Sequence, residues 1–110
     1  MNADLHQQVV EKCARLIQEN HHEHEDIIRF LQNAADPYSI PFLRQAVQLK
    51  PRLSYLAYDN YGAYYKKCFW ALRAIGTPEA IIVIREFATS DILAAREQAL
   101  YRLSKIEGGL

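Results

Sequence analysis

The residues with the clearest chemical potential form one polar run, HHEHED at positions 21–26. Imidazole and carboxylate groups are common ligands of divalent metals. These residues are consecutive, however, whereas the i, i+4 spacing is the one that places two ligands on one helical face. No distant Cys/His set complements them. We therefore expect no bound metal here, but a solvated loop leading into a helix whose acidic first turn complements the helix dipole.

A second candidate is a group of five tyrosines within eleven residues, of which the first four are spaced by three. Tyrosine is enriched in protein interfaces because it offers a large, rigid contact area with a polar tip. Charged residues surround the group and would form a polar rim. The predicted partner-binding residues are Arg52, Tyr55, Tyr58, Asp59, Tyr61, Tyr64, Lys66 and Lys67.

Core packing is the alternative role for the tyrosines. Tyr61 and Tyr65 lie on the inward stripe of the helix predicted there, so packing is favoured for these two. For Tyr55, Tyr58 and Tyr64 the two roles are evenly balanced. Packing is also favoured over an interface role for the nearby Trp70, which lies beside the core face.

Other chemistry finds less support in the sequence. A glycine-rich phosphate loop and a nucleophile with an adjacent base are both absent, so we expect no enzymatic activity and no cofactor. Basic residues concentrate between positions 44 and 73, beside tyrosines, which is the composition of a nucleic-acid platform. The formal net charge is zero, however, so no general positive field attracts nucleic acid. A solvated face is the favoured interpretation.

Composition sets further expectations. With 110 residues, half of them hydrophobic, the sequence predicts a single globular domain over 1–110. It contains no apolar run long enough to cross a membrane and no secretory signal. Cys13 and Cys68 each lie in an apolar helical stripe, which favours two buried, reduced thiols over a disulfide. These features predict a cytoplasmic protein.

Six segments show helical spacing of apolar residues. They are 4–18, 24–35, 38–49, 61–75, 78–88 and 91–107. Asp36 or Ser39 is the expected N-cap of the third segment, Thr77 of the fifth and Asp91 of the sixth, and Gly76 is the expected C-terminal cap of the fourth. Residues 80–84 (AIIVI) are apolar all round, which predicts that the fifth helix is central.

The chain also repeats itself. Residues 27–47 match residues 68–88 at an offset of 41, and Trp70–Ile75 match Tyr101–Ile106 at an offset of 31. A period of this length over helical pattern is typical of solenoids built from helix pairs. The predicted pairs are antiparallel and cover about 4–35, 38–75 and 78–107. The difference between the two offsets places an insertion of about ten residues, at 49–60, inside the middle pair.

The repeating segments resemble HEAT repeats. The sequence IPFLRQAV at 40–47 resembles the first helix of such a repeat, and SDILAAREQALYRLSKI at 90–106 resembles the second. The middle pair departs from the pattern, because Asn60 and Tyr65 stand where the last pair has Asp91 and Arg96. The resemblance implies a short right-handed α-α solenoid that binds proteins and performs no chemistry.

The longer segment 40–81 also resembles small bacterial HEAT-like proteins, some of which look like immunity proteins of polymorphic toxin systems. This resemblance implies a non-enzymatic protein that binds and neutralises a cognate toxin. The alternatives are a structural adaptor or assembly factor, and a nucleic-acid-binding HEAT-like protein. An exposed aromatic surface would also permit homo-oligomers.

Overall fold

The computed structural model describes residues 2–57 and 62–107. Within these ranges every regular element is helical, which confirms the predicted all-α class. The six α-helices are α1 (Asn2–Leu16), α2 (His24–Ala34), α3 (Ile40–Leu49), α4 (Ala63–Ile75), α5 (Pro78–Phe87) and α6 (Leu93–Ile106). Three short 3-10 helices are η1 (Pro37–Ser39), η2 (Lys50–Arg52) and η3 (Ser54–Leu56). Each α-helix begins and ends within two residues of its predicted bounds.

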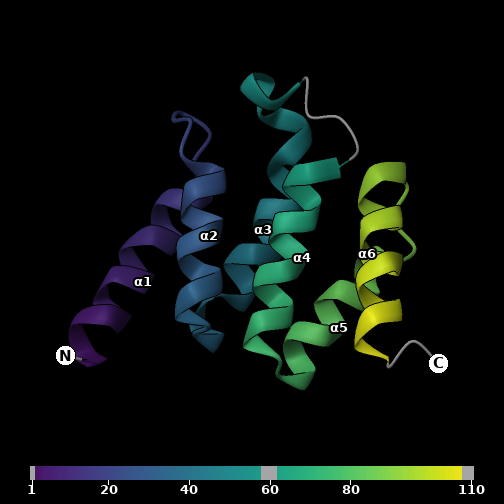
Figure 1. The fold of residues 1–110 in the computed structure, drawn as a ribbon. Coiled ribbons are helices and arrows are strands. Elements are labelled where there is room, and N and C mark those ends of the chain that lie inside the picture. The colour runs from purple at the N-terminus through teal and green to yellow at the C-terminus, as the bar shows by residue number, and fades with distance from the viewer. Residues whose placement is uncertain (1, 58–61, 108–110) are drawn as a thin grey trace.

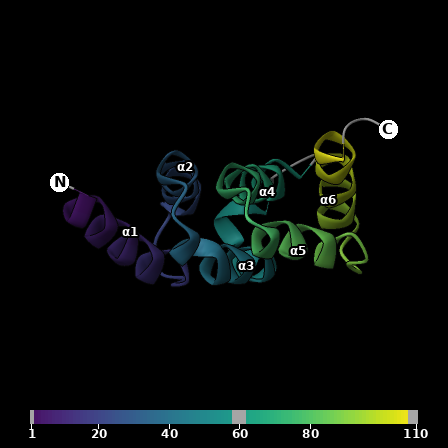
Figure 2. The same cartoon turned by 90° about the horizontal axis from the view of Figure 1, so that it is seen from below.

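The helices form a flat, two-layered body with extents of 39 × 33 × 16 Å (Figures 1 and 2). One layer holds α1, α3 and α5, and the other holds α2, α4 and α6 (Figure 2). Within the second layer, α4 lies between α2 and α6 and contacts both along its length. It also contacts α3 and α5 of the first layer, so α4 is the central helix of the fold.

The core follows from this position of α4. Its residues Cys68, Phe69 and Leu72 are fully buried. The prediction that the fifth helix is central is wrong, because Ile82 in the middle of α5 is 62% exposed. The AIIVI run packs one face of α5 on the core and leaves the opposite face in solvent. Single exposed apolar residues of this kind are common on the surfaces of folded proteins.

The helix ends confirm most of the predicted caps. The Asp36 carboxylate accepts a hydrogen bond from the Tyr38 N–H at 2.9 Å, and Thr77 Oγ1 accepts one from the Ala80 N–H at 3.2 Å. Gly76 ends α4 in the left-handed conformation with φ of 72°, which glycine adopts without steric cost. Asp91 is not the cap of α6. The residue at that position is Ile92, which offers no side-chain cap, and the Ser90 Oγ accepts a hydrogen bond from the Ile92 N–H at 3.0 Å in the turn before the helix.

The insertion between α3 and α4 packs onto the core. Leu53, between η2 and η3, is 3% exposed, and Tyr55 and Leu56 pack against the buried cluster. The Lys50 ammonium donates to the Leu56 carbonyl oxygen at 3.1 Å and so joins η2 to η3. The enlarged turn is thus in part a cover for the core, while positions 58–60 of it lie outside the described residues.

The two cysteines are free and buried, as the sequence predicts. Burial raises the pKa of the Cys13 thiol to about 12 and also raises the pKa of Cys68. Both thiols therefore remain protonated and unreactive at neutral pH. In the described part of the chain, no helix has the length and apolar content that crossing a membrane requires.

Candidate partner-binding surface

The tyrosines predicted for partner binding do not form one surface. Tyr64 is fully buried in α4, and its hydroxyl donates to the Ala46 carbonyl oxygen at 2.9 Å. Its assignment to the interface is corrected for that reason, since a buried side chain offers no area to a partner. Tyr65 is 3% exposed, in line with the favoured packing role. Tyr58, Asp59 and Tyr61 lie outside the described residues.

Tyr55 is partly buried and joins the insertion to α2. Its hydroxyl lies 2.7 Å from His24 Nδ1 and 3.3 Å from the His24 backbone nitrogen. Its ring stacks on His22 with 4.3 Å between ring centroids. The polar tip that makes tyrosine useful in an interface is therefore already engaged within the protein.

Two of the predicted rim residues also have partners within the protein. The Arg52 guanidinium lies 3.2 Å from a Glu19 carboxylate oxygen, and the Lys67 ammonium lies 2.7 Å from Glu25. Both pairs connect the α3–α4 region to the segment around the α1–α2 turn. Lys66 differs from them, because it is exposed and has no ion-pair partner among the described residues.

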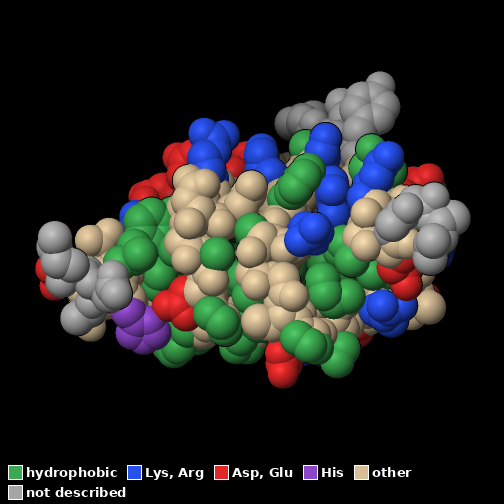
Figure 3. Space-filling view, turned by 60° about the horizontal axis from the view of Figure 1, so that its bottom comes forward, with side chains coloured by type: hydrophobic (Ala, Val, Ile, Leu, Met, Phe, Trp, Pro, Cys, Tyr) green, Lys and Arg blue, Asp and Glu red, His purple; other side chains and the backbone are tan. Residues whose placement is uncertain are grey.

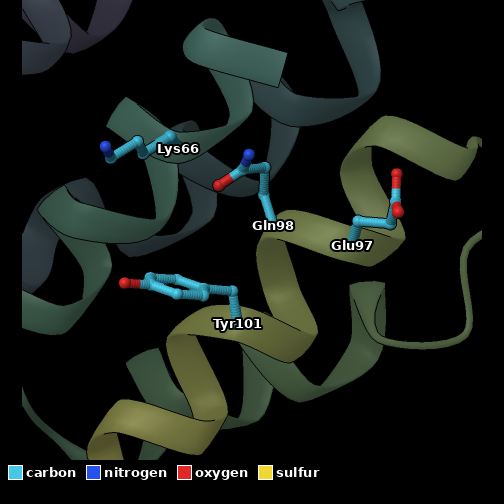
Figure 4. Close-up of a pocket in the computed structure, with 4 residues that line it drawn as sticks. All are labelled: Lys66, Glu97, Gln98 and Tyr101. Carbon is cyan, nitrogen blue, oxygen red and sulfur yellow. The ribbon is translucent and has the colours of Figure 1, made fainter. Parts of the chain in front are cut away.

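Lys66 lines a groove between α4 and α6 that the sequence analysis did not assign. The groove consists of two adjoining hollows of about 430 and 370 Å³. We define the α4–α6 groove by its lining residues, Lys66, Trp70, Glu97, Gln98, Tyr101, Arg102 and Lys105. In Figure 4, Tyr101 extends from α6 toward α4, the Lys66 ammonium extends from α4 on the side away from Gln98, and Glu97 points away from the other three residues.

An arginine held between aromatic rings forms the floor of the groove. The Arg102 guanidinium carbon lies 3.8 Å from the centroid of the Trp70 ring and 5.5 Å from that of Tyr101. Arg102 is only 6% exposed, whereas Trp70 is 40% and Tyr101 52% exposed. The Lys105 ammonium lies 5.3 Å from the Tyr101 centroid on the other side. Such cation–π contacts fix the two rings in place while leaving much of their area in solvent.

The electrostatics of the groove are mainly positive, because its lining holds three cations, Lys66, Arg102 and Lys105, and one carboxylate, Glu97. Among the described residues, no carboxylate lies within ion-pair distance of Lys66, Arg73, Arg102 or Lys105. Burial lowers the pKa of Arg102, and the nearby positive charge of Arg73 lowers it further. Arginine still stays protonated at neutral pH. Lys and Arg side chains accordingly gather over α4 and α6, with hydrophobic side chains among them (Figure 3).

The internal repeat of the sequence contains a signal for this groove. The alignment at offset 31 places Trp70 on Tyr101, so the two residues are equivalent positions of consecutive second helices. Neighbouring repeats present equivalent residues on one face. Lys66, Trp70 and Arg73 also follow the i, i+4, i+7 spacing of a single helical stripe. The pattern of one helix alone does not show this signal, because it depends on aligning α4 with α6.

The positive potential leads to a direct prediction, because Trp70 is the only tryptophan. We expect iodide to quench its fluorescence more strongly than caesium at equal ionic strength, since cations at the groove concentrate anions. The measurement is a pair of Stern–Volmer titrations with neutral acrylamide as reference. Replacing Lys66 and Lys105 with glutamine should reduce the difference between the quenching constants of iodide and caesium. Equal quenching by iodide and caesium would contradict the charge assignment.

The HHEHED segment is more ordered than the predicted solvated loop. His24 is fully buried and His21 is 8% exposed, with their rings stacked at 4.1 Å. Nε2 of His21 donates to the Arg15 carbonyl oxygen and Nε2 of His24 to that of Gln18, both at 2.6 Å. The Nδ1 atoms accept hydrogen bonds from the Glu23 N–H and the Tyr55 hydroxyl. These contacts leave no lone pair for a metal, and no three-residue metal cluster occurs in the described ranges.

The hydrogen bonds of His24 suit a neutral imidazole, because its Nε2 donates to the Gln18 carbonyl oxygen while its Nδ1 accepts from the Tyr55 hydroxyl. Burial lowers the pKa of His24 below its ordinary value of 6.5, and His21 and His22 lower it further, against the raising effect of the Gln18 carbonyl. The other charged groups near the pair are Arg15 and Glu23, which are ion-paired to each other at 2.6 Å, and Glu25.

We therefore expect acid to destabilise the protein through His24. Above pH 6.5 the residue is neutral in both the folded and the unfolded chain, so its contribution is constant. As the pH falls from 6.5 toward the lowered folded pKa, only the unfolded chain binds the proton. The free energy of unfolding should then fall by up to about 1.4 kcal/mol per pH unit. Urea unfolding from pH 8 to pH 5 would measure this.

His24→Gln should remove that part of the pH dependence, because glutamine does not titrate. His22→Gln, a change at an exposed ring of the same segment, is the matched control and should keep most of the slope, over a pH range reduced slightly because the charge of His22 no longer lowers the pKa of His24. An identical slope for the wild type and His24→Gln would contradict the assignment.

Comparisons with known proteins add no relative to this description. No protein-family model matches the chain, and no match was found among curated proteins or solved structures. We therefore infer the function from the groove itself.

Proposed function

We propose that this protein is a non-enzymatic protein-binding module and that the α4–α6 groove is its contact surface. The observation that carries the proposal is the exposed Trp70–Arg102–Tyr101 stack. Tryptophan, tyrosine and arginine are the three residue types most enriched among the residues that dominate binding energy in protein interfaces. Here they occur together, on a rigid pair of packed helices, in a shallow groove.

The fold proposed for this function is a short HEAT-like solenoid of three helix pairs. The alternation of helices between two layers supports it, because α2, α4 and α6 follow one another in one layer. The repeat at offsets of 41 and 31 supports it independently. In such an arrangement the second helices form a continuous surface, and the groove lies between the last two of them.

The specific role we propose is that of an immunity protein that binds and neutralises a bacterial toxin in the cytoplasm. The resemblance of residues 40–81 to small bacterial HEAT-like immunity proteins supports this role. Neutralisation would occur by occlusion. The rigid Trp70 and Tyr101 rings would exclude water from the centre of the interface, and the surrounding Lys66 and Lys105 would accelerate encounter with an acidic partner.

A nucleic-acid-binding role is the second candidate, favoured by cations that lie beside two aromatic rings and have no carboxylate partner in the part of the chain that the structure describes. Two observations weigh against it. One face of the Trp70 indole is already covered by Arg102 at 3.8 Å, so that face is closed to a base. The net charge of the chain is zero, which removes the long-range attraction to phosphates.

A pull-down from the native cells tests the protein-binding proposal. The bait would be the tagged wild type, compared with a Trp70→Ala, Tyr101→Ala double variant under a moderate-salt wash. We expect one stoichiometric protein that the double variant fails to retain, and a toxin-like domain in it would support the immunity role. A housekeeping complex would favour the adaptor alternative. Co-purified nucleic acid, or equal capture by both baits, would count against the proposed surface.

A further inference from the structure

The buried cation of the groove lacks a counter-ion, and this distinguishes it from most other arginines of the protein. Arg44 pairs with Glu86 and Arg15 with Glu23 through two hydrogen bonds or more, although all four side chains are at least 41% exposed. Arg102 is far less exposed and has only the Trp70 and Tyr101 rings as partners among the described residues. Removing a charge from water is costly unless it is paired.

The rings offset the cost at Arg102 only in part, because a cation–π contact replaces less of the lost hydration than an ion pair with hydrogen bonds does. A carboxylate placed at the guanidinium would complete the pairing with two parallel hydrogen bonds. Arg102 lines the smaller hollow of about 370 Å³, so a group bound in that hollow would lie beside this residue. Lys66 and Lys105 line the same hollow and add charge of the same sign.

We infer that the α4–α6 groove is a receptor for an acidic peptide segment of the partner protein, in which an Asp or Glu carboxylate pairs with Arg102. This inference rests on the proposed protein-binding function and adds the chemistry of the partner. Apolar residues next to the carboxylate would pack on the exposed areas of Trp70 and Tyr101. Lys66 and Lys105 would contact further acidic residues at the edge of the segment.

The shape of the groove favours a peptide over a single-stranded nucleic acid. The two hollows, of about 430 and 370 Å³, are each the size of a few side chains. Base recognition on single strands depends on free aromatic faces, and cations cover part of both rings. A carboxylate flanked by apolar side chains uses the ring edges and the guanidinium at the same time.

The test uses the full-length protein and the fluorescence of Trp70. The probes are a short peptide that alternates Glu with Val, its matched Gln–Val peptide, and oligothymidylate. We expect the acidic peptide alone to give a saturable change in Trp70 emission. Arg102→Lys keeps the charge but loses the planar fork, and it should weaken the acidic peptide about tenfold. Arg29→Gln, which removes an exposed arginine from α2, is the matched control and should bind as the wild type does.

Each other outcome overturns the inference. Equal binding of the Glu–Val and Gln–Val peptides would show that the carboxylate is not recognised. Failure of the acidic peptide to saturate would show that the groove is no acidic-peptide receptor, and tighter binding of oligothymidylate would assign it to nucleic acid. The pull-down with the Trp70→Ala, Tyr101→Ala variant reports on the proposed function separately, because it does not depend on the chemistry of the peptide. If Arg102→Lys fails to fold, the surface variant Lys105→Gln takes its place. It should also weaken binding of the acidic peptide, because it removes a positive charge from the same hollow.

Discussion

Alanine at both Trp70 and Tyr101 should lower the affinity for the partner by at least about a hundredfold, because large aromatic anchors at interface centres each contribute 2 kcal/mol or more. Folding should change only modestly, since the two side chains are 40% and 52% exposed and their removal opens the Arg102 guanidinium to water. The loss of the rings does remove both stacking partners of Arg102. Calorimetric titration of the purified partner gives the affinity, and urea unfolding gives the stability.

Tyr38→Ala is the matched control for this experiment. Tyr38 is 39% exposed and also belongs to an aromatic cluster, with His6 and Phe42, but it lies in η1 and not in the groove. We expect wild-type affinity for this variant. A double variant that binds normally, or a Tyr38 variant that binds as weakly as the double variant, would remove the groove from the interface.

Tyr64→Ala should lower the free energy of unfolding by about 3–5 kcal/mol, the range for truncating a buried aromatic residue. Tyr64 is fully buried, and its hydroxyl satisfies the carbonyl of Ala46 in the last turn of α3. Carbonyls in that turn lack a complete set of partners within the helix. Tyr64→Phe keeps the ring but leaves that carbonyl without its donor, so about 1–3 kcal/mol should be lost. Urea unfolding of both variants measures these differences.

Partner affinity separates the structural role of Tyr64 from the interface role that its sequence position suggested. Tyr64→Phe should bind the partner as the wild type does, because the hydroxyl is buried and bonded to Ala46. A large loss of affinity with unchanged stability would return Tyr64 to the interface and contradict the burial argument.

The helices were predictable because their signals are local. Apolar stripes fixed their positions within two residues, and caps such as Thr77 and Gly76 fixed individual ends. Asp91 failed as a cap because α6 begins only at Leu93, so that Ile92 occupies the cap position and no side chain caps the helix. The prediction of a central α5 was wrong because a β-branched apolar run carries no information on which side of a helix is covered.

The candidate site was harder to predict because it depends on contacts between helices. The tyrosine cluster suggested an interface by composition, but composition cannot distinguish a buried Tyr64 from an exposed Tyr101. The groove required knowing that α4 and α6 are neighbours and that Arg102 packs on Trp70. The fixed positions of the His21 and His24 rings also depend on tertiary structure. The backbone carbonyls of Arg15 and Gln18, at the end of α1 and just after it, accept hydrogen bonds from these rings.

Hydroxyl-radical footprinting of the protein, free and bound to its captured partner, tests the central claim most directly. The central claim is that the partner covers the α4–α6 groove. We predict that Trp70 and Tyr101 lose most of their reactivity in the complex, whereas Tyr38 and Ile82, both exposed elsewhere, keep theirs. Full reactivity of Trp70 and Tyr101 in the complex, with protection at another surface, would contradict the account.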